Sequence, residues 1–449
     1  MNLLSFRTVS VIIVLATVMV FGFQVAQAEQ VTAGQSGVLG GDKQPQMQEI
    51  TDAWARFRDR DVEGALQSLE AAVKKNSDLS PVYVLLAQFY EAANIPQGVL
   101  QSLETGIQKN PDDPEAYVLL AQVALRDRRL TEAELLFNKA NSILAKYDKN
   151  PKRKEAMMPI LIGGLAQVYQ TREDWTTAKK YLDQWLKLDP KNTQAMQRLA
   201  FVLYQQKDSQ AALAKLKEAK TSDPNAMTPE ATLAAFCQQS GDKDNAKKWM
   251  AAALTAAPND LRTQLVAAQL AMENGQFEDA QNRAAAALRI DPNSLDAKNL
   301  RGLVALFQKD YKNAELYFES AHLKSPSNFS ASNNLALALV EQKDEAKKRR
   351  ALEFAESNVR QYSKSTEAAS TYGWVLYKLG QIEDADKALR AALSTGNIMP
   401  DTAYYAAVVA GDRGRKEEAK GLLKAALKST TPFTMKQEAT ALMEQLNKE

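Results

Sequence analysis

The stretch that decides the fold is residues 291–326, which read DPNSLDAKNLRGLVALFQKDYKNAELYFESAHLKSP. The prolines near its two ends are 34 residues apart, and the same interval separates five prolines along the chain: Pro190, Pro224, Pro258, Pro292 and Pro326. A second set of residues has the same period: Ala178, Ala212, Ala246, Ala280 and Ala314. Two sets in a fixed register indicate an internal repeat, and the repeat decides the fold before any single residue does.

Each repeat unit carries two helical patterns separated by a short polar turn. In the unit 114–147, small residues such as Ala121 and Ala133 recur at helical spacing within apolar faces. Small side chains let two helix backbones approach closely. The residue before a proline avoids the helical region, so the Asp-Pro pairs end the second helix of a unit.

The alanine positions extend in both directions to Ala65, Val99, Ala133, Ala351, Ala385 and Ala419, with a step of 45 residues before Ala178 and one of 37 before Ala351. The sequence therefore predicts an all-α solenoid of about eleven helix–turn–helix units over residues 46–433. An apolar stripe in residues 434–449 predicts one further helix that caps the last unit.

This pattern resembles the tetratricopeptide repeat, on residues such as Gly302, Ala314, Phe318, Ala321 and Pro326 in one unit. The resemblance implies helix pairs that stack into a superhelix, with the first helix of each unit lining the inner surface. It also implies that this surface binds a peptide segment or a partner protein. Some members of the family bind acidic C-terminal peptides through a Lys and an Asn one turn apart, and no unit here carries that pair.

The composition disfavours several other functions. The chain has 449 residues and 56 Lys and Arg against 54 Asp and Glu, so it lacks the positive excess of a nucleic-acid binder. Cys237 and His322 are its single cysteine and histidine, too few for a zinc site. Cys237 occupies a packing position, and adjacent acids such as Glu417 and Glu418 lack a convergent partner. We therefore expect no catalytic residues, no metal, no cofactor and no nucleic-acid partner.

The N-terminus predicts export. Residues 1–28 combine Arg7, an apolar run over 9–23 and small residues at Ala26 and Ala28, which is typical of a signal peptide cleaved after Ala28. The alternative is an uncleaved membrane anchor, because residues 8–28 carry no charge and are long enough to cross a bilayer. Residues 29–45 are rich in glycine and predict a flexible linker. The expected location is the periplasm or cell envelope of a bacterium.

The predicted inner stripe changes character along the chain. Its members are Gln88, Gln122, Gln167, Gln197, Gln269, Asn333, Trp374, Tyr377, Tyr404 and Tyr405. Aromatic anchors beside amide side chains are typical of peptide-binding surfaces, so we expect the four aromatic residues to be exposed in a groove. Basic clusters stand at the two breaks in the repeat, over 149–154 and 347–350, and are interpreted as solvated helix faces rather than docking patches.

These features predict a noncatalytic scaffold or adaptor outside the cytoplasm that holds a peptide segment or partner protein. One alternative is a membrane-tethered organiser of an envelope secretion or polymer-export complex, with residues 1–28 as its anchor. Another is carbohydrate binding by the region from Trp374 to Tyr405, which requires those rings to be exposed.

Overall fold

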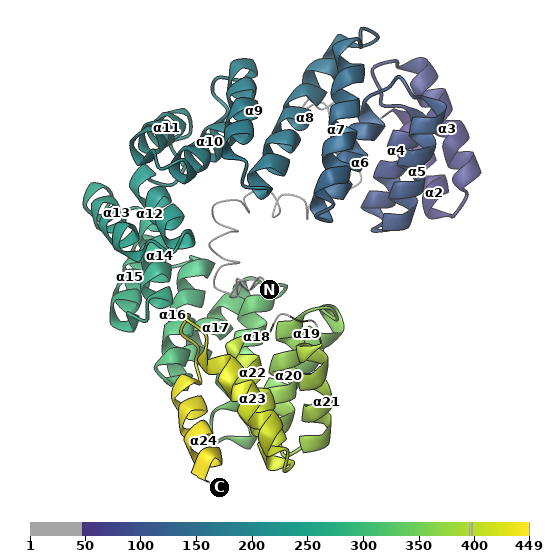
Figure 1. Ribbon diagram of the computed structural model, residues 1–449. Helices are drawn as coiled ribbons and strands as arrows, with labels where there is room; N and C mark the ends of the chain where they lie inside the picture. The colour runs from purple at the N-terminus through teal and green to yellow at the C-terminus, as the bar shows by residue number, and fades with distance from the viewer. Residues whose placement is uncertain (1–46, 395, 397, 449) are drawn as a thin grey trace, which may run out of the picture. The chain divides into compact units, whose positions relative to one another are not determined.

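The computed structural model describes residues 47–394, 396 and 398–448, and these residues form 23 α-helices (Figure 1). The predicted signal peptide (1–28) and linker (29–45) lie outside the described residues. The chain divides into two compact units, which for the described residues are the N unit (47–229) and the C unit (230–448). Within the described part of the chain, no helix is both long and apolar enough to cross a membrane.

The N unit contains five helix pairs. They are α2 (Gln48–Arg58) with α3 (Val62–Lys75), α4 (Val82–Ala92) with α5 (Pro96–Lys109), α6 (Glu115–Arg126) with α7 (Leu130–Ala145), α8 (Pro151–Thr171) with α9 (Trp175–Leu188), and α10 (Thr193–Gln205) with α11 (Ser209–Ser222).

The C unit contains six helix pairs and a final helix. They are α12 (Pro229–Gln239) and α13 (Lys243–Ala256), α14 (Leu261–Glu273) and α15 (Phe277–Ile290), α16 (Leu295–Phe307) and α17 (Tyr311–Lys324), α18 (Phe329–Val340) and α19 (Glu345–Gln361), α20 (Thr366–Lys378) and α21 (Ile382–Leu393), α22 (Pro400–Asp412) and α23 (Lys416–Leu427), then α24 (Lys436–Lys448). Eleven pairs over the described residues confirm the expected all-α solenoid.

The repeated small residues are buried in the second helix of every pair. All eleven positions of the extended alanine series are at most 8% exposed, from Ala65 on α3 to Ala419 on α23. A side chain of one methyl group lets the second helix approach its neighbours closely, and the larger residue one turn later fills the remaining space. Phe137 and Phe318 occupy that later position and are fully buried.

Glycines on two first helices make room for those phenylalanines. A Cβ atom on Gly164 would lie 2.2 Å from the Phe137 ring, and one on Gly302 would lie 2.6 Å from the Phe318 ring. Contacts this short are not tolerated, so only glycine accommodates the ring at these positions.

The turn inside each pair has a constant backbone geometry. In ten of the eleven pairs one residue of this turn has a positive φ, and these residues are Arg60, Asn94, Arg128, Glu173, Lys207, Gly241, Gly275, Lys309, Gly380 and Gly414. In several pairs the next residue is an aspartate that caps the second helix; Asp174, for example, accepts a hydrogen bond from the Thr177 amide at 3.0 Å. The exception among the described turns joins α18 to α19, where the shorter insertion falls.

The two insertions change helix lengths and leave the pairing intact. The step of 45 residues is absorbed by α7 and α8, which have 16 and 21 residues where most helices have 11 to 14. The step of 37 residues is absorbed by the α18–α19 turn and by α19, which has 17 residues. Each insertion therefore adds helical surface at one junction of the solenoid.

Candidate interaction groove

The amide-rich stripe of the N unit lies on successive first helices. Gln88 is on α4, Gln122 on α6, Gln167 on α8 and Gln197 on α10. Gln122 and Gln167 are exposed, whereas Gln88 and Gln197 are half-buried. Since α6 packs against α8, the two exposed amides belong to neighbouring first helices. The N unit thus presents uncharged donors and acceptors on this stripe.

Beside that stripe, Arg198 on α10 is 8% exposed and is held by neutral groups. Its guanidinium donates to Gln170 Oε1 at 2.6 Å and to the Gly163 carbonyl at 3.1 Å, and it lies 5.7 Å from the Trp185 ring. Burial lowers the pKa of Arg198 to about 10. Arg198 therefore fixes α8 to α10 from within the repeat junction.

The aromatic residues of the C unit form a stack rather than an open row. The Trp374 ring lies between Tyr405, at 4.3 Å between centroids with planes 15° apart, and Tyr377, at 5.2 Å and 20°. Tyr404 contacts the same tryptophan at 6.0 Å. Offset stacks of this kind add stability beyond the area that they bury. The first helices α20 and α22 are joined through these rings.

Glu341 holds the polar edge of the stack. Its carboxylate accepts a hydrogen bond from Trp374 Nε1 at 2.6 Å and one from Lys378 Nζ at 2.9 Å. The Lys378 ammonium also lies 5.4 Å from the centre of the Trp374 ring. On the other side, the Tyr377 hydroxyl donates to Asp412 at 2.7 Å. The tryptophan indole is thus satisfied within the protein.

The expectation that these rings are exposed is wrong for three of the four. Trp374, Tyr404 and Tyr405 are 4%, 8% and 3% exposed, and only Tyr377 is half-buried. Burial raises the pKa of Tyr405 and of Tyr404 well above the ordinary value, and burial with the Asp412 hydrogen bond raises that of Tyr377 to about 12. Carbohydrate binding required exposed rings and loses its support.

The chain's own C-terminal segment, residues 429–448, packs into the same apolar cluster as these rings. Phe433 and Met435 are buried in the same apolar cluster as Trp374, Tyr404 and Tyr405. The remaining predicted stripe residues of the C unit are also inaccessible, since Gln269 and Asn333 are 6% and 7% exposed. Sequence reasoning expected residues 434–449 to form a helix that caps the last unit, and α24 packs against α23. It did not anticipate the ion pair of Glu438 with Lys309 of a much earlier repeat.

The basic cluster of the first insertion is not a uniformly solvated face, because Arg153 is buried. It forms ion pairs with Glu115, on α6, and with Asp113, the latter at 3.0 Å, and it donates to the Tyr147 hydroxyl at 2.8 Å. Burial lowers the pKa of Arg153, and the two carboxylates more than reverse this effect. Because α8 is longer than most helices, Arg153 in its first turn reaches Glu115 of the preceding helix pair.

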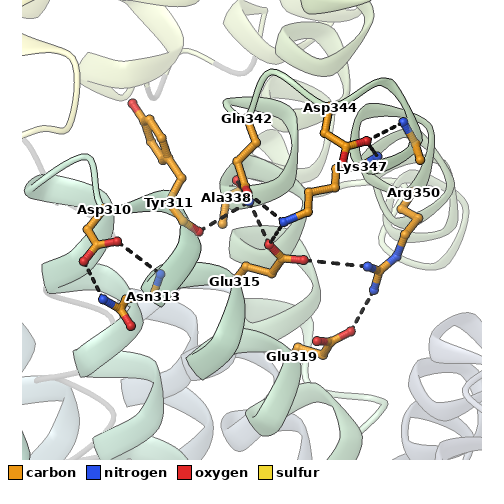
Figure 2. Close-up of polar contacts among 11 residues, drawn as sticks. Asp310, Tyr311, Asn313, Glu315, Glu319, Ala338, Gln342, Asp344, Lys347 and Arg350 are labelled. Carbon is orange, nitrogen blue, oxygen red and sulfur yellow. Dashed lines mark hydrogen bonds and ion pairs between the residues drawn. The ribbon is translucent and has the colours of Figure 1, made fainter.

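The basic cluster of the second insertion is largely paired as well. Lys347 donates to Glu315 at 2.5 Å and to Gln342 at 2.7 Å, and Arg350 donates to Glu319 at 2.7 Å (Figure 2). Figure 2 shows these side chains of α19 pointing toward Glu315 of α17. Lys348 pairs with Glu345. This cluster serves to join α17 to α19 across the insertion.

Residues considered for chemistry lie apart from one another. Cys237 is buried on α12, as expected for a packing position. His322 is half-buried on α17 and meets Phe354 edge to face at 5.2 Å. Among the described residues, no group of three or more His, Cys, Asp or Glu side chains is placed to hold a metal ion.

Sequence models of the tetratricopeptide repeat match residues 100–151, 164–226, 231–260 and 265–326. No curated protein matches the sequence. Solved structures with a similar arrangement include yeast Tom70, at 14% identity and a TM-score of 0.38 over 89% of this chain and 95% of that one.

A second is a tetratricopeptide repeat protein from Parabacteroides merdae, at 14% identity and a TM-score of 0.40 over 65% of this chain and 99% of that one. A third is a tetratricopeptide repeat protein of Thermus thermophilus, at 17% identity and a TM-score of 0.38 over 42% of this chain and all of that one. The repeat models and the eleven helix pairs, with their buried small residues in constant register, carry the assignment. The chain belongs to the tetratricopeptide repeat family.

Proposed function

We propose that this protein is a noncatalytic scaffold outside the cytoplasm, and that the amide stripe of the N unit holds an extended segment of a partner protein. Tetratricopeptide repeats are typically interaction scaffolds rather than catalysts. A carboxamide both donates and accepts hydrogen bonds, so a row of glutamines matches the alternating groups of a peptide backbone. This chemistry favours recognition of the partner's main chain over recognition of its charge.

The observation that carries the proposal is the exposure of Gln122 and Gln167 on neighbouring first helices. Both are accessible, whereas Gln269, at the corresponding position of the C unit, is buried. Neighbouring packed helices lie about 8–10 Å apart, so uncharged polar residues at repeat spacing present the same group at about every third residue of an extended bound chain. The N unit therefore offers the accessible part of the inner stripe.

The location is supported by residues 1–28, whose pattern is that of a signal peptide. A retained N-terminal helix would instead make the protein a tethered organiser of an envelope complex. Mass spectrometry of the N-terminus of the mature chain separates the two, because a chain that starts at Glu29 is free and one that keeps Arg7 is anchored.

The scaffold proposal is tested by affinity capture from the native envelope fraction with the full chain and with the double variant Gln122→Ala and Gln167→Ala. The matched control is Gln101→Ala with Gln108→Ala, two exposed glutamines on the second helix α5. We expect a stoichiometric partner that the wild type and the control retain and the stripe variant loses by tenfold or more. Equal recovery on all three chains would refute the stripe as the binding surface.

A further inference from the structure

We infer that the inner stripe of the C unit is a receptor for an amphipathic segment with a glutamate that pairs with Lys309. The chain's own C-terminal segment occupies this receptor in the free chain, and a partner segment of the same chemistry displaces it. The inference rests on the proposed scaffold function and adds the chemistry of a second binding surface. The contacts of the resident segment show which features the stripe recognises, and a partner segment must share these features.

The first feature is polar recognition at the start of the segment. Thr434 Oγ1 donates to Asp401 Oδ1 at 2.6 Å, and the backbone amides of Thr434 and Met435 donate to the same carboxylate. Asp401 belongs to the first helix α22. One carboxylate thus accepts hydrogen bonds from a hydroxyl and two main-chain amides. A segment that binds here must therefore have two backbone N–H groups at this point that are not used within a helix.

The second feature is an acidic side chain one turn later. Glu438 forms an ion pair with Lys309, which lies 129 residues away in the turn between α16 and α17. Glu438 also adds to the negative field that raises the pKa of Tyr311 to about 12, after burial. A further contact lies at the preceding pair, where Pro432 Cγ is 3.8 Å from the position of a Cβ on Gly275.

These contacts connect α22 to turns that belong to much earlier repeats of the same unit. In a solenoid each repeat ordinarily contacts its neighbours alone, so a pair such as Lys309 with Glu438 shows that the segment passes from the last pair back to the third of the unit (Figure 1). The segment therefore extends from the last pair to turns of earlier pairs, in addition to packing against α23.

The third feature is an apolar face. Ala439 and Leu446 are buried against the C unit, and Leu442 and Met443 are partly buried on the same cluster. The spacing of these residues places them on one side of α24. The opposite side is solvated, with Glu444 exposed. A partner segment needs the same order: a phenylalanine and a hydroxyl residue, then an acid, then an apolar helical face.

The resident segment fits the stripe incompletely, which makes displacement feasible. The second carboxylate oxygen of Glu438 is buried and has no hydrogen-bond partner among the described residues. The Glu438 side chain as a whole is 34% exposed, so its ion pair with Lys309 is screened by solvent and adds little to the hold on the segment. The short connection after α23 keeps a released segment nearby at a high effective concentration, so a competing segment must bind more tightly than the resident does.

The test is a titration of full-length chains with a labelled peptide that spans residues 429–448. Phe433→Ala with Glu438→Ala weakens the resident segment, and Glu444→Ala is the matched control on its solvated side. We expect the doubly substituted chain to bind the peptide at least tenfold more tightly than the wild type, with the control unchanged. Lys309→Glu in the doubly substituted chain should weaken binding severalfold, and a peptide carrying Glu438→Lys should restore it.

Circular dichroism establishes that each variant is folded before titration. Equal peptide affinity in the wild type and in the folded double variant overturns the inference, as does indifference to Lys309→Glu. Light scattering tests whether a second copy of the chain is the occupant. A wild-type dimer that the peptide dissociates would show that it is, and would overturn the inference that a separate partner binds here. The capture experiment with Gln122 and Gln167 tests the scaffold proposal alone, and the peptide titration tests the C unit alone. Failure of one proposal is therefore distinguishable from failure of the other.

Discussion

The two units are built from the same repeat and differ in what covers the inner stripe. In the N unit Gln122 and Gln167 are exposed on neighbouring first helices. In the C unit the corresponding surface is closed by ring stacking around Trp374 and by residues 429–448. The repeat therefore determines where the stripe runs, whereas contacts from outside the repeat determine whether a partner can reach it.

The largest expected difference concerns the insertions, one in each unit. Arg153→Ala leaves Glu115 buried without its ion-pair partner, and we expect it to lower the free energy of unfolding by about 3–5 kcal/mol. Arg350→Ala removes a pair whose arginine is 43% exposed, which solvent screens, and should cost less than about 1 kcal/mol. Urea denaturation of both variants measures this contrast, and equal losses would contradict it.

A second prediction removes part of the cover in the C unit. Phe433→Ala should destabilise the C unit by about 3 kcal/mol, because an almost fully buried ring is replaced by a cavity. The same change should increase solvent access to Trp374, seen as a red shift of fluorescence and stronger quenching by acrylamide. Leu323→Ala, at a side chain that is 74% exposed, is the control and should change neither quantity.

The third prediction uses the carboxylate that anchors the C-terminal segment. Burial raises the pKa of Asp401 to about 6, against hydrogen bonds from Thr434 and Met435 that lower it. Because the folded state holds this proton more tightly than the unfolded state does, the contribution of Asp401 to stability is greatest below about pH 4 and falls as pH rises to about 6.

Relative to Asp401→Asn, the wild type should therefore lose on the order of 2 kcal/mol of unfolding free energy between about pH 4 and pH 7. Chemical denaturation of both chains at several pH values measures the difference and removes contributions that they share. A constant difference across this range would show that the Asp401 pKa is not raised.

The fold was largely predictable because its signal repeats. The alanine register required each position to be buried, and burial from Ala65 to Ala419 bears this out. The turn geometry carried a weaker signal that sequence reasoning missed: Gly241, Gly275, Gly380 and Gly414 occupy the left-handed position of their turns, where glycine has the least strain.

Contacts between distant residues were not predictable from local pattern in either unit. Arg153 lies 38 residues from Glu115, and Lys309 lies 129 residues from Glu438, so neither pair belongs to a repeat spacing or to a helix face. The position of Trp374 on a first helix was predicted correctly, and exposure in a groove was expected from that position. The ring is buried instead, because it packs against Tyr405 in a cluster that also includes residues outside the repeat. Long-range closure of this kind follows from tertiary packing alone.

The smallest expected effect compares one stripe position in the two units. Gln122 and Gln269 occupy the same register, but Gln122 is exposed and Gln269 is 6% exposed with a hydrogen bond to Glu273 at 3.2 Å. Gln269→Ala should cost about 1 kcal/mol, because Glu273 loses a donor in a buried site where burial already raises its pKa. Gln122→Ala should stay within about 0.5 kcal/mol of the wild type. Thermal unfolding of the two variants measures this difference in stability. Equal stability would mean that the stripe is equally accessible in both units. The two units would then differ in the chemistry of their stripe side chains and not in how deeply the stripe is buried.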